Sequence, residues 1–219
     1  MKYKIELHCH TAPVSGCSIL SGEDIIRLYK EAGYDAITVT DHFTSDYFRH
    51  HDFEEYFQGY ELAKKVGEEV GIKVYLGAEF RFDGSANDYL LFGVTKEFLK
   101  EATKMFTADH YTFHDFTKKN GVLFYQAHPF RPGLTRAPAD ALDGMEIYNM
   151  HPHHHSNNPT AIEYAKEKGL HGISGSDAHE PHMVGRGGIL AETLPNDGIE
   201  LRDLILSRNY ELIHNGECV

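Results

Sequence analysis

The chain lacks the features that mark secreted, membrane-spanning and zinc-finger proteins. Its 3 cysteines form neither a zinc-finger spacing nor an even disulfide set, which favours a reducing compartment. No apolar run comes near the roughly 20 residues that a membrane helix requires. The first residues have the pattern of a strand and not of a secretory signal. These absences predict a cytoplasmic protein with no membrane partner.

Positive charge is scarce as well. Lys and Arg number 21 against 33 Asp and Glu, which gives a formal net charge of −12 with His neutral. Because nucleic-acid affinity depends largely on many Lys and Arg contacts to phosphate, this balance argues against a long nucleic acid as partner. It is compatible with a small phosphorylated substrate, since bound divalent cations can reverse the local field.

Histidine, by contrast, is abundant, with 16 residues, and it is the commonest metal ligand in proteins. Several of these side chains, together with acidic ones, directly follow short apolar runs. The run 4–7 is followed by His8 and His10, the run 36–40 by Asp41 and His42, and the run 74–78 by Glu79. The run 122–127 is followed by His128, the run 145–148 by Asn149, and the run 172–175 by Asp177 and His179.

Helical patterns alternate with the apolar runs. They cover 21–33, 52–70, 96–105, 112–120, 159–168 and 198–207, and further strands are expected at 89–94 and 210–213. Ser21 is the expected N-cap of the first helix, with Asp24 completing an approximate capping box. Repetition of strand and helix implies an α/β fold with parallel strands. A complete eight-stranded barrel typically needs about 250 residues, so we expect residues 1–219 to form one domain, a distorted seven-stranded (β/α) barrel similar to a TIM barrel.

The carboxyl ends of parallel strands converge on one rim of such a barrel, where its chemistry lies. We therefore expect the His, Asp and Glu side chains to form one polynuclear metal site at this C-terminal rim. Side chains alternate along a strand, so His8 and His10 point the same way and Cys9 points to the opposite face. Glu79 has two oxygens and can bridge two cations, as two-metal hydrolytic sites require.

Further polar residues extend the expected site. Asp177 and His179 lie on one side if the strand geometry continues, so each could bind a different metal. Arg131 could bind a substrate phosphate through both ends of its guanidinium, and Arg186, in a glycine-rich loop, could supply a second positive charge. The His tract at 151–155 is equally compatible with a polar loop. The remaining histidines, at 50, 51, 110, 114, 171, 182 and 214, are interpreted mostly as surface or packing residues.

Together these motifs resemble the PHP family, named for polymerase and histidinol phosphatase domains. The similar segments are 6–11, 36–42, 77–79, 126–129 and 174–179, in this order. The resemblance implies a distorted seven-stranded barrel, up to three divalent metals (often zinc, manganese or iron) and hydrolysis of phosphate esters. It implies His8, His10, Glu79 and Asp177 as ligands of a first metal, Glu79 and His128 of a second, and His42 and His179 of a third.

The sequence departs from the family pattern at two positions. After His10 the family often has Asp or His, whereas the loop 11–18 contains neither, which leaves Cys17 or water as the missing ligand. Between Glu79 and His128 no ligand is in register, and His110 and His114 are the nearby candidates. A metal-binding scaffold without turnover is therefore kept as an alternative.

The favoured hypothesis is a metal-dependent phosphoesterase, with a phosphomonoester as the first choice of substrate. Two or three divalent ions (Zn, Mn or Fe) would activate the attacking water. The expected catalytic residues are Glu79, Asp177, His179 and His154, and the expected substrate-binding residues are Arg131, Arg186 and Asn149. His154 or His179 would protonate the leaving group. An amidohydrolase that cleaves C–N bonds is the second enzymatic alternative.

Overall fold

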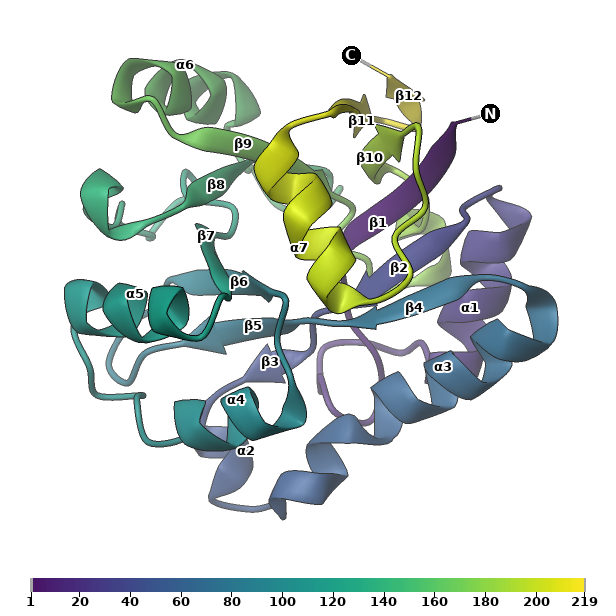
Figure 1. Cartoon of the computed structure of the whole chain (residues 1–219), viewed down its shortest axis with the longest axis horizontal. Helices are drawn as coiled ribbons and strands as arrows, with labels where there is room; N and C mark the ends of the chain where they lie inside the picture. The colour runs from purple at the N-terminus through teal and green to yellow at the C-terminus, as the bar shows by residue number, and fades with distance from the viewer. Residues whose placement is uncertain (1, 219) are drawn as a thin grey trace.

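Two six-stranded sheets form the framework of the chain (Figure 1), and the computed structural model describes residues 2–218. The first sheet has the order β12-β11-β10-β1-β2-β4 and comprises β1 (Tyr3–Cys9), β2 (Ala36–Val39), β4 (Lys73–Leu76), β10 (Gly187–Ala191), β11 (Tyr210–His214) and β12 (Glu217–Cys218). The second has the order β3-β5-β6-β7-β8-β9 and comprises β3 (His42–Phe43), β5 (Ala78–Arg81), β6 (Asp88–Phe92), β7 (Leu123–Gln126), β8 (Gly144–Asn149) and β9 (His171–Gly175). The predicted mixed α/β class is confirmed.

Helices form at every place where the sequence pattern predicts one. They are α1 (Gly22–Glu31), α3 (Gln58–Val70), α4 (Lys96–Ala102), α5 (His110–Lys119), α6 (Asn158–Lys168) and α7 (Gly198–Ser207), with short additions at α2 (Ser45–Phe48), η1 (Phe53–Phe57), η2 (Ala139–Ala141) and η3 (Pro181–Met183). Ser21 caps α1, and it forms the predicted capping box with Asp24. Among the described residues, none of these helices has the length and apolar character needed to cross a membrane.

The predicted number of seven strands is wrong, because two apolar runs each supply strands to both sheets. The segment 36–43, which begins with the run 36–40, forms β2 in the first sheet and β3 in the second. The segment 73–81, which contains the run 74–78, forms β4 and then β5. A continuous apolar run gives no sign of where a strand leaves one sheet for another. At the C-terminus, β10 also pairs antiparallel with β1, β11 with β10 and β12 with β11, an extension that the sequence pattern only partly predicts.

The strand directions differ from the expected parallel pattern in the second sheet too. The pairs β3–β5, β7–β8 and β8–β9 are parallel, as are β1–β2 and β2–β4 in the first sheet. Strand β6, however, is antiparallel to both of its neighbours, β5 and β7. Its first residue and not its last therefore lies at the edge where the parallel strands end.

The two sheets join on both sides of the site, through two parallel chain passages on one side and through backbone hydrogen bonds on the other. On one side, Gly77 N–H donates to Val39 O (2.9 Å) and Glu79 N–H donates to Asp41 O (3.0 Å). On the other, Asp177 N–H donates to His8 O (2.8 Å), and a bridge pairs Cys9 with Ala178. The carboxyl end of β1 therefore lies between the end of β9 and the chain that passes from β2 to β3.

Three buried clusters fill the space behind these strands. One is rich in aromatic side chains and packs α4 and α5 against the second sheet; a second packs α7 against both sheets. The third packs α1 and α3 against β1 and β2, and it includes Cys9, whose thiol donates to Thr38 O (3.3 Å). Cys9 thus faces away from His8 and His10, as the alternation along the strand predicts.

Gly77 is the point where the chain passes from the first sheet to the second, and it has no room for a side chain. A Cβ there would lie 2.8 Å from the Cγ2 atoms of both Thr38 and Thr40 and 3.2 Å from Leu91 O.

We predict that Gly77→Ala lowers the free energy of unfolding by about 1–3 kcal/mol, the usual cost of overpacking, as measured by urea denaturation. Gly198→Ala is the matched control, because the nearest atom to its Cβ is Leu76 O at 3.9 Å. Equal urea midpoints for the two variants would contradict this reading of Gly77.

Candidate metal centre

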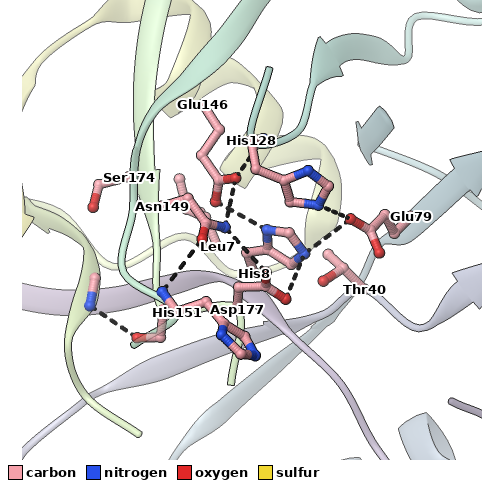
Figure 2. Close-up of polar contacts among 12 residues, drawn as sticks. Leu7, His8, Thr40, Glu79, His128, Glu146, Asn149, His151, Ser174 and Asp177 are labelled. Atoms are coloured by element: carbon pink, nitrogen blue, oxygen red, sulfur yellow. Dashed lines mark hydrogen bonds and ion pairs between the residues drawn. The ribbon is translucent and has the colours of Figure 1, made fainter. Parts of the chain in front are cut away.

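Seven side chains that the sequence predicts as metal ligands meet in one buried cluster. Figure 2 shows four of them, His8, Glu79, His128 and Asp177. They come from the end of β1, the start of β3, the middle of β5 and the segments just after β7 and β9, and they are His8, His10, His42, Glu79, His128, Asp177 and His179. Potential ligand atoms lie within 4.8 Å of one another in each of four overlapping groups. The structure therefore brings together residues that are up to 171 positions apart in the sequence.

Glu79 lies at the centre of this cluster, with its side chain only 1% exposed. Its Oε1 is 3.2 Å from His8 Nε2 and 3.1 Å from His128 Nε2. Its Oε2 is 2.8 Å from His42 Nδ1 and 3.5 Å from His10 Nε2. Each carboxylate oxygen thus faces two imidazoles, an arrangement suited to a carboxylate that bridges two cations.

Asp177 closes the cluster on the opposite side. Its Oδ1 is 3.2 Å from His10 Nε2 and 3.4 Å from His8 Nε2. Its Oδ2 accepts hydrogen bonds from Asn149 Nδ2 (3.1 Å) and from the Arg131 guanidinium. The Asp177 backbone is left-handed, with φ of 53°, a conformation that costs about 1–3 kcal/mol in a residue other than glycine.

The buried carboxylate of Glu6 fixes the backbone that carries these ligands. Its Oε1 accepts from His8 N–H (2.9 Å) and from Ser176 N–H (2.9 Å), and its Oε2 accepts from Tyr29 O–H (2.7 Å). One side chain therefore joins the end of β1 to the segment that leads into Asp177. Burial raises the pKa of Glu6 despite these hydrogen bonds.

Several polar atoms in the cluster have no hydrogen-bond partner within the described residues. They include Glu79 Oε2, His42 Nδ1 and His128 Nδ1, all buried. His8 Nε2 and His10 Nε2 lie 3.1 Å apart and face the same two carboxylates. Buried polar atoms are normally paired, so Glu79 Oε2 and His42 Nδ1, which form no hydrogen bond although they lie 2.8 Å apart, fit a shared cation. The imidazole and carboxylate donors suit zinc, manganese or iron.

The protonation of the cluster follows from its charges. Burial opposes ionisation of Glu79, but the His8 and His42 imidazoles hold its pKa well below the usual range. Burial also lowers the pKa of His8, yet Asp177, Glu146 and Glu79 raise it well above its ordinary value. His10 differs, because burial and the neighbouring His179 and His42 hold its pKa well below that value. Without a cation, protons on imidazoles balance the buried carboxylates.

Glu146 is a site residue that the sequence pattern does not reveal. It lies inside β8, and its Oε1 is 2.9 Å from His8 Nδ1. Its Oε2 accepts from Asn149 Nδ2 and from His128 N–H, both at 2.9 Å. A carboxylate bound to one imidazole nitrogen orients the other nitrogen toward a metal. The only signal in the sequence is an acidic residue within an apolar run.

Asp88 fills the gap between Glu79 and His128 that the sequence leaves open. It is the first residue of β6 and forms a ligand group with His42 and Glu79. Its Oδ2 is 3.9 Å from His128 Nε2. Sequence reasoning misses it because β6 is antiparallel, so the residue before the apolar run reaches the site and not the one after it.

The two histidines proposed for that gap lie elsewhere. His110 Nε2 pairs with Tyr89 Oη (2.6 Å), and His114 Nε2 lies 3.2 Å from Asp143 Oδ1. Both are on α5, which packs behind the second sheet. Neither histidine belongs to any of the four ligand groups found among the described residues.

A cavity of about 290 Å³ opens above the ligands. Its lining includes Arg131, whose Nη2 donates to Asn149 Oδ1 (2.8 Å), and His154, which lies against His151 with ring centroids 4.4 Å apart. Asn149 itself is buried, and its side chain holds Asp177 and Glu146. Asn149 is therefore placed to support ligands, in addition to any contact with substrate.

Arg186 is not brought to this cavity. Its guanidinium donates to Asn215 Oδ1 (3.0 Å), and its backbone N–H donates to Ser176 Oγ (3.0 Å) at the start of β10. The chain there turns to run antiparallel to β1 and so leaves the rim. Arg81, which the sequence pattern does not single out, lines the cavity instead and pairs with Asp88 through Nε–Oδ1 (2.6 Å) and Nη2–Oδ2 (2.8 Å).

Cys17 also lines the cavity, next to His42 and His179. Desolvation raises the pKa of its thiol, but the proximity of the His179 and His42 imidazoles outweighs this effect and brings the pKa of Cys17 to about 6. The loop after His10, which has no Asp or His, therefore still presents one side chain to the metal centre.

Comparisons with known proteins agree with this geometry. The sequence model of the PHP domain matches residues 6–176, and that of a PHP-associated region matches 155–204. A two-domain protein from Bacteroides vulgatus, described as containing a predicted PHP-like metal-dependent phosphoesterase, superposes with a TM-score of 0.71 at 18% identity, over 100% of this chain and 66% of that one. This chain thus spans just under two thirds of that protein.

Two other solved structures share the fold. An amidohydrolase from Chromobacterium violaceum, with bound sulfate and no metal, gives a TM-score of 0.62 at 14% identity over 96% of this chain and 98% of that one. The lesion-specific endonuclease Q of Pyrococcus furiosus gives 0.60 at 16% identity over 94% and 56%. A search of curated proteins finds no match. Because the PHP model covers most of the chain and the ligands it implies meet at one point, the chain belongs to the PHP domain family.

Proposed function

We propose that this chain is a divalent-metal-dependent phosphoesterase that hydrolyses a small phosphomonoester. The observation that carries the proposal is the cluster of seven His, Glu and Asp side chains, five of which line one cavity together with Arg131. We further infer that the two sheets act together as one distorted barrel, with the metal centre at the rim where the parallel strands end.

The ligand geometry supports two sites close together and a third beside them. His8, His10, Glu79 and Asp177 would hold the first cation. Glu79, His128 and Asp88 would hold the second, and His42 with His179 the third. Bound cations of this kind supply Lewis-acid stabilisation of phosphoryl oxygens and lower the pKa of water toward about 7.

The other residues bind and orient the substrate. The Arg131 guanidinium is fixed by Asp177 and Asn149 and is aimed into the cavity, where it can bind phosphate through two N–H groups. Arg81 lies on another wall of the same cavity and takes the role that the sequence assigns to Arg186. Both guanidiniums would stabilise negative charge as the ester bond breaks.

His154 remains the proposed proton donor to the leaving group. Partial burial and the nearby Arg131 lower its pKa in the free protein. The negative charge of a bound phosphate acts in the opposite direction and favours the protonated imidazole. His179 is more closely engaged with the ligands, since its Nδ1 lies 2.8 Å from Asp177 O.

A small substrate is favoured over a nucleic acid. Endonuclease Q, solved in complex with a 27-mer duplex substrate that has an abasic lesion at the active site, shares the fold. This chain, however, carries a net charge of −12, which opposes extended contact with a phosphate backbone. The amidohydrolase fold neighbour keeps C–N hydrolysis as the second candidate. The arginines that line the cavity favour phosphate, because cleavage of a C–N bond has no need for them.

The proposal is tested by assaying the manganese- and zinc-loaded protein on a phosphomonoester, an abasic DNA duplex and an N-acyl amino acid. We predict turnover of the phosphomonoester, and we predict that Glu79→Gln or Asp177→Asn lowers kcat by at least about a hundredfold, since several kcal/mol of charge stabilisation would be lost. Circular dichroism should show both variants folded. Undiminished turnover in either variant, or cleavage of the amide or the DNA alone, would contradict the proposal.

The arginine assignment gives a second prediction with an internal control. Arg131→Ala should raise KM for a phosphomonoester by about tenfold or more, because a charge-assisted hydrogen bond contributes about 1.5–3 kcal/mol. Arg186→Ala should leave KM unchanged, since Arg186 binds Asn215 outside the cavity. Metal content, measured in parallel, separates a loss of phosphate binding from a loss of metal. A larger effect from Arg186→Ala than from Arg131→Ala would overturn the assignment.

A further inference from the structure

Two histidines outside the metal centre face each other beside the cavity. His153 Nε2 lies 3.2 Å from His182 Nε2, and both side chains are exposed. His153 belongs to the His tract after β8, and His182 lies within η3. Neither belongs to any of the four ligand groups found among the described residues, so the pair is separate from the centre around Glu79.

The distance between the two nitrogens suits a shared cation. Zinc binds imidazole nitrogen at about 2.0–2.1 Å with tetrahedral geometry, which places two such ligands about 3.3 Å apart. The planes of the His153 and His182 rings make an angle of 66°, with centroids 5.3 Å apart. The rings therefore meet through their Nε2 ends and do not stack.

A carboxylate beside the pair favours the tautomer that binds a metal. Glu180 Oε2 lies 3.6 Å from Nδ1 of His182, the ring nitrogen that is not directed at His153. Its negative charge favours the ring proton on Nδ1 and leaves the Nε2 lone pair for a cation. The backbone here is fixed as well, because the buried Met183 donates its N–H to Glu180 O (3.0 Å).

The pair joins two walls of the cavity where it meets solvent. His153 and His154 line the cavity from the segment after β8, and both are exposed. Glu180 and Met183 line it from the segment that contains η3. A phosphate ester that reaches the ligands has to pass these walls, and a cation bound to His153 and His182 would hold them together.

We propose that His153 and His182 form a peripheral zinc site that closes the mouth of the cavity and inhibits hydrolysis when zinc is in excess. On binding, both Nε2 lone pairs are donated to the cation, and each neutral ring keeps its single proton on Nδ1. Water completes the coordination, so this zinc binds more weakly than the cations of the centre, whose groups each offer three side chains. The inhibition rests on the proposed phosphoesterase function, whereas the binding site does not.

The binding is tested by equilibrium dialysis of the full chain against buffered free zinc, with zinc content measured by atomic absorption. We predict that the wild-type chain binds one more zinc than either His153→Gln or His182→Gln, and that the difference lies in the zinc that binds most weakly. His155→Gln is the matched control, because it removes another exposed histidine of the same tract and leaves the pair intact.

Turnover gives a second readout. Excess zinc should inhibit hydrolysis of a phosphomonoester by the wild-type chain and by His155→Gln. Half-inhibition of His153→Gln or His182→Gln should need more zinc by at least the roughly tenfold that loss of even an outer partner of a metal ligand costs. Circular dichroism should show all three variants folded, since the substituted side chains are exposed.

The outcomes separate this inference from the proposed function. Equal zinc content in the wild-type chain and both pair variants overturns the site, as does loss of the same zinc from His155→Gln. An extra zinc that depends on the pair but leaves turnover unchanged supports the site and overturns its inhibitory role. An extra zinc that depends on the pair, in a chain that hydrolyses no phosphate ester, supports the site and overturns the proposed function.

Discussion

The buried carboxylate of Glu79 is the group on which the arrangement of the site depends. A carboxylate removed from water has to be paired, and here four imidazoles from three strands surround it within 3.5 Å. Two of these imidazoles, those of His8 and His10, also face Asp177. Too few positive charges from the protein are present for these carboxylates, so protons or cations complete the balance. The chain passage at Gly77 and the support from Glu6 and Glu146 hold this crowded arrangement in place.

The ligands could be predicted from the sequence because each follows, or ends, a short apolar run. Such a run locates a strand, and a polar residue at its end lies at the rim wherever the strand runs parallel to its neighbours. His8, His128 and Asp177 are of this kind, and they meet as predicted. The predicted helices form for a related reason, since their caps and glycine stops are local signals, as at Ser21.

The parts that could not be predicted depend on the path of the chain in space. No local pattern shows that the run through Gly77 changes sheets, so the number of strands was wrong. No local pattern shows that β6 runs antiparallel, so Asp88 was missed and two histidines on α5 took its place. Arg186 lies in a glycine-rich loop whose direction is set by the pairing of β10, and its side chain binds Asn215 outside the cavity. Arg81 lines the cavity where Arg186 was expected.

The most direct test of the account is anomalous diffraction at the zinc, manganese and iron edges from a crystal of the full chain grown with phosphate. We predict at least two peaks within the cluster, one among His8, His10, Glu79 and Asp177 and one beside His128, with phosphate oxygens between them and Arg131. A cluster in which the imidazoles and carboxylates bond only to one another, with no anomalous peak among them, would contradict the central claim.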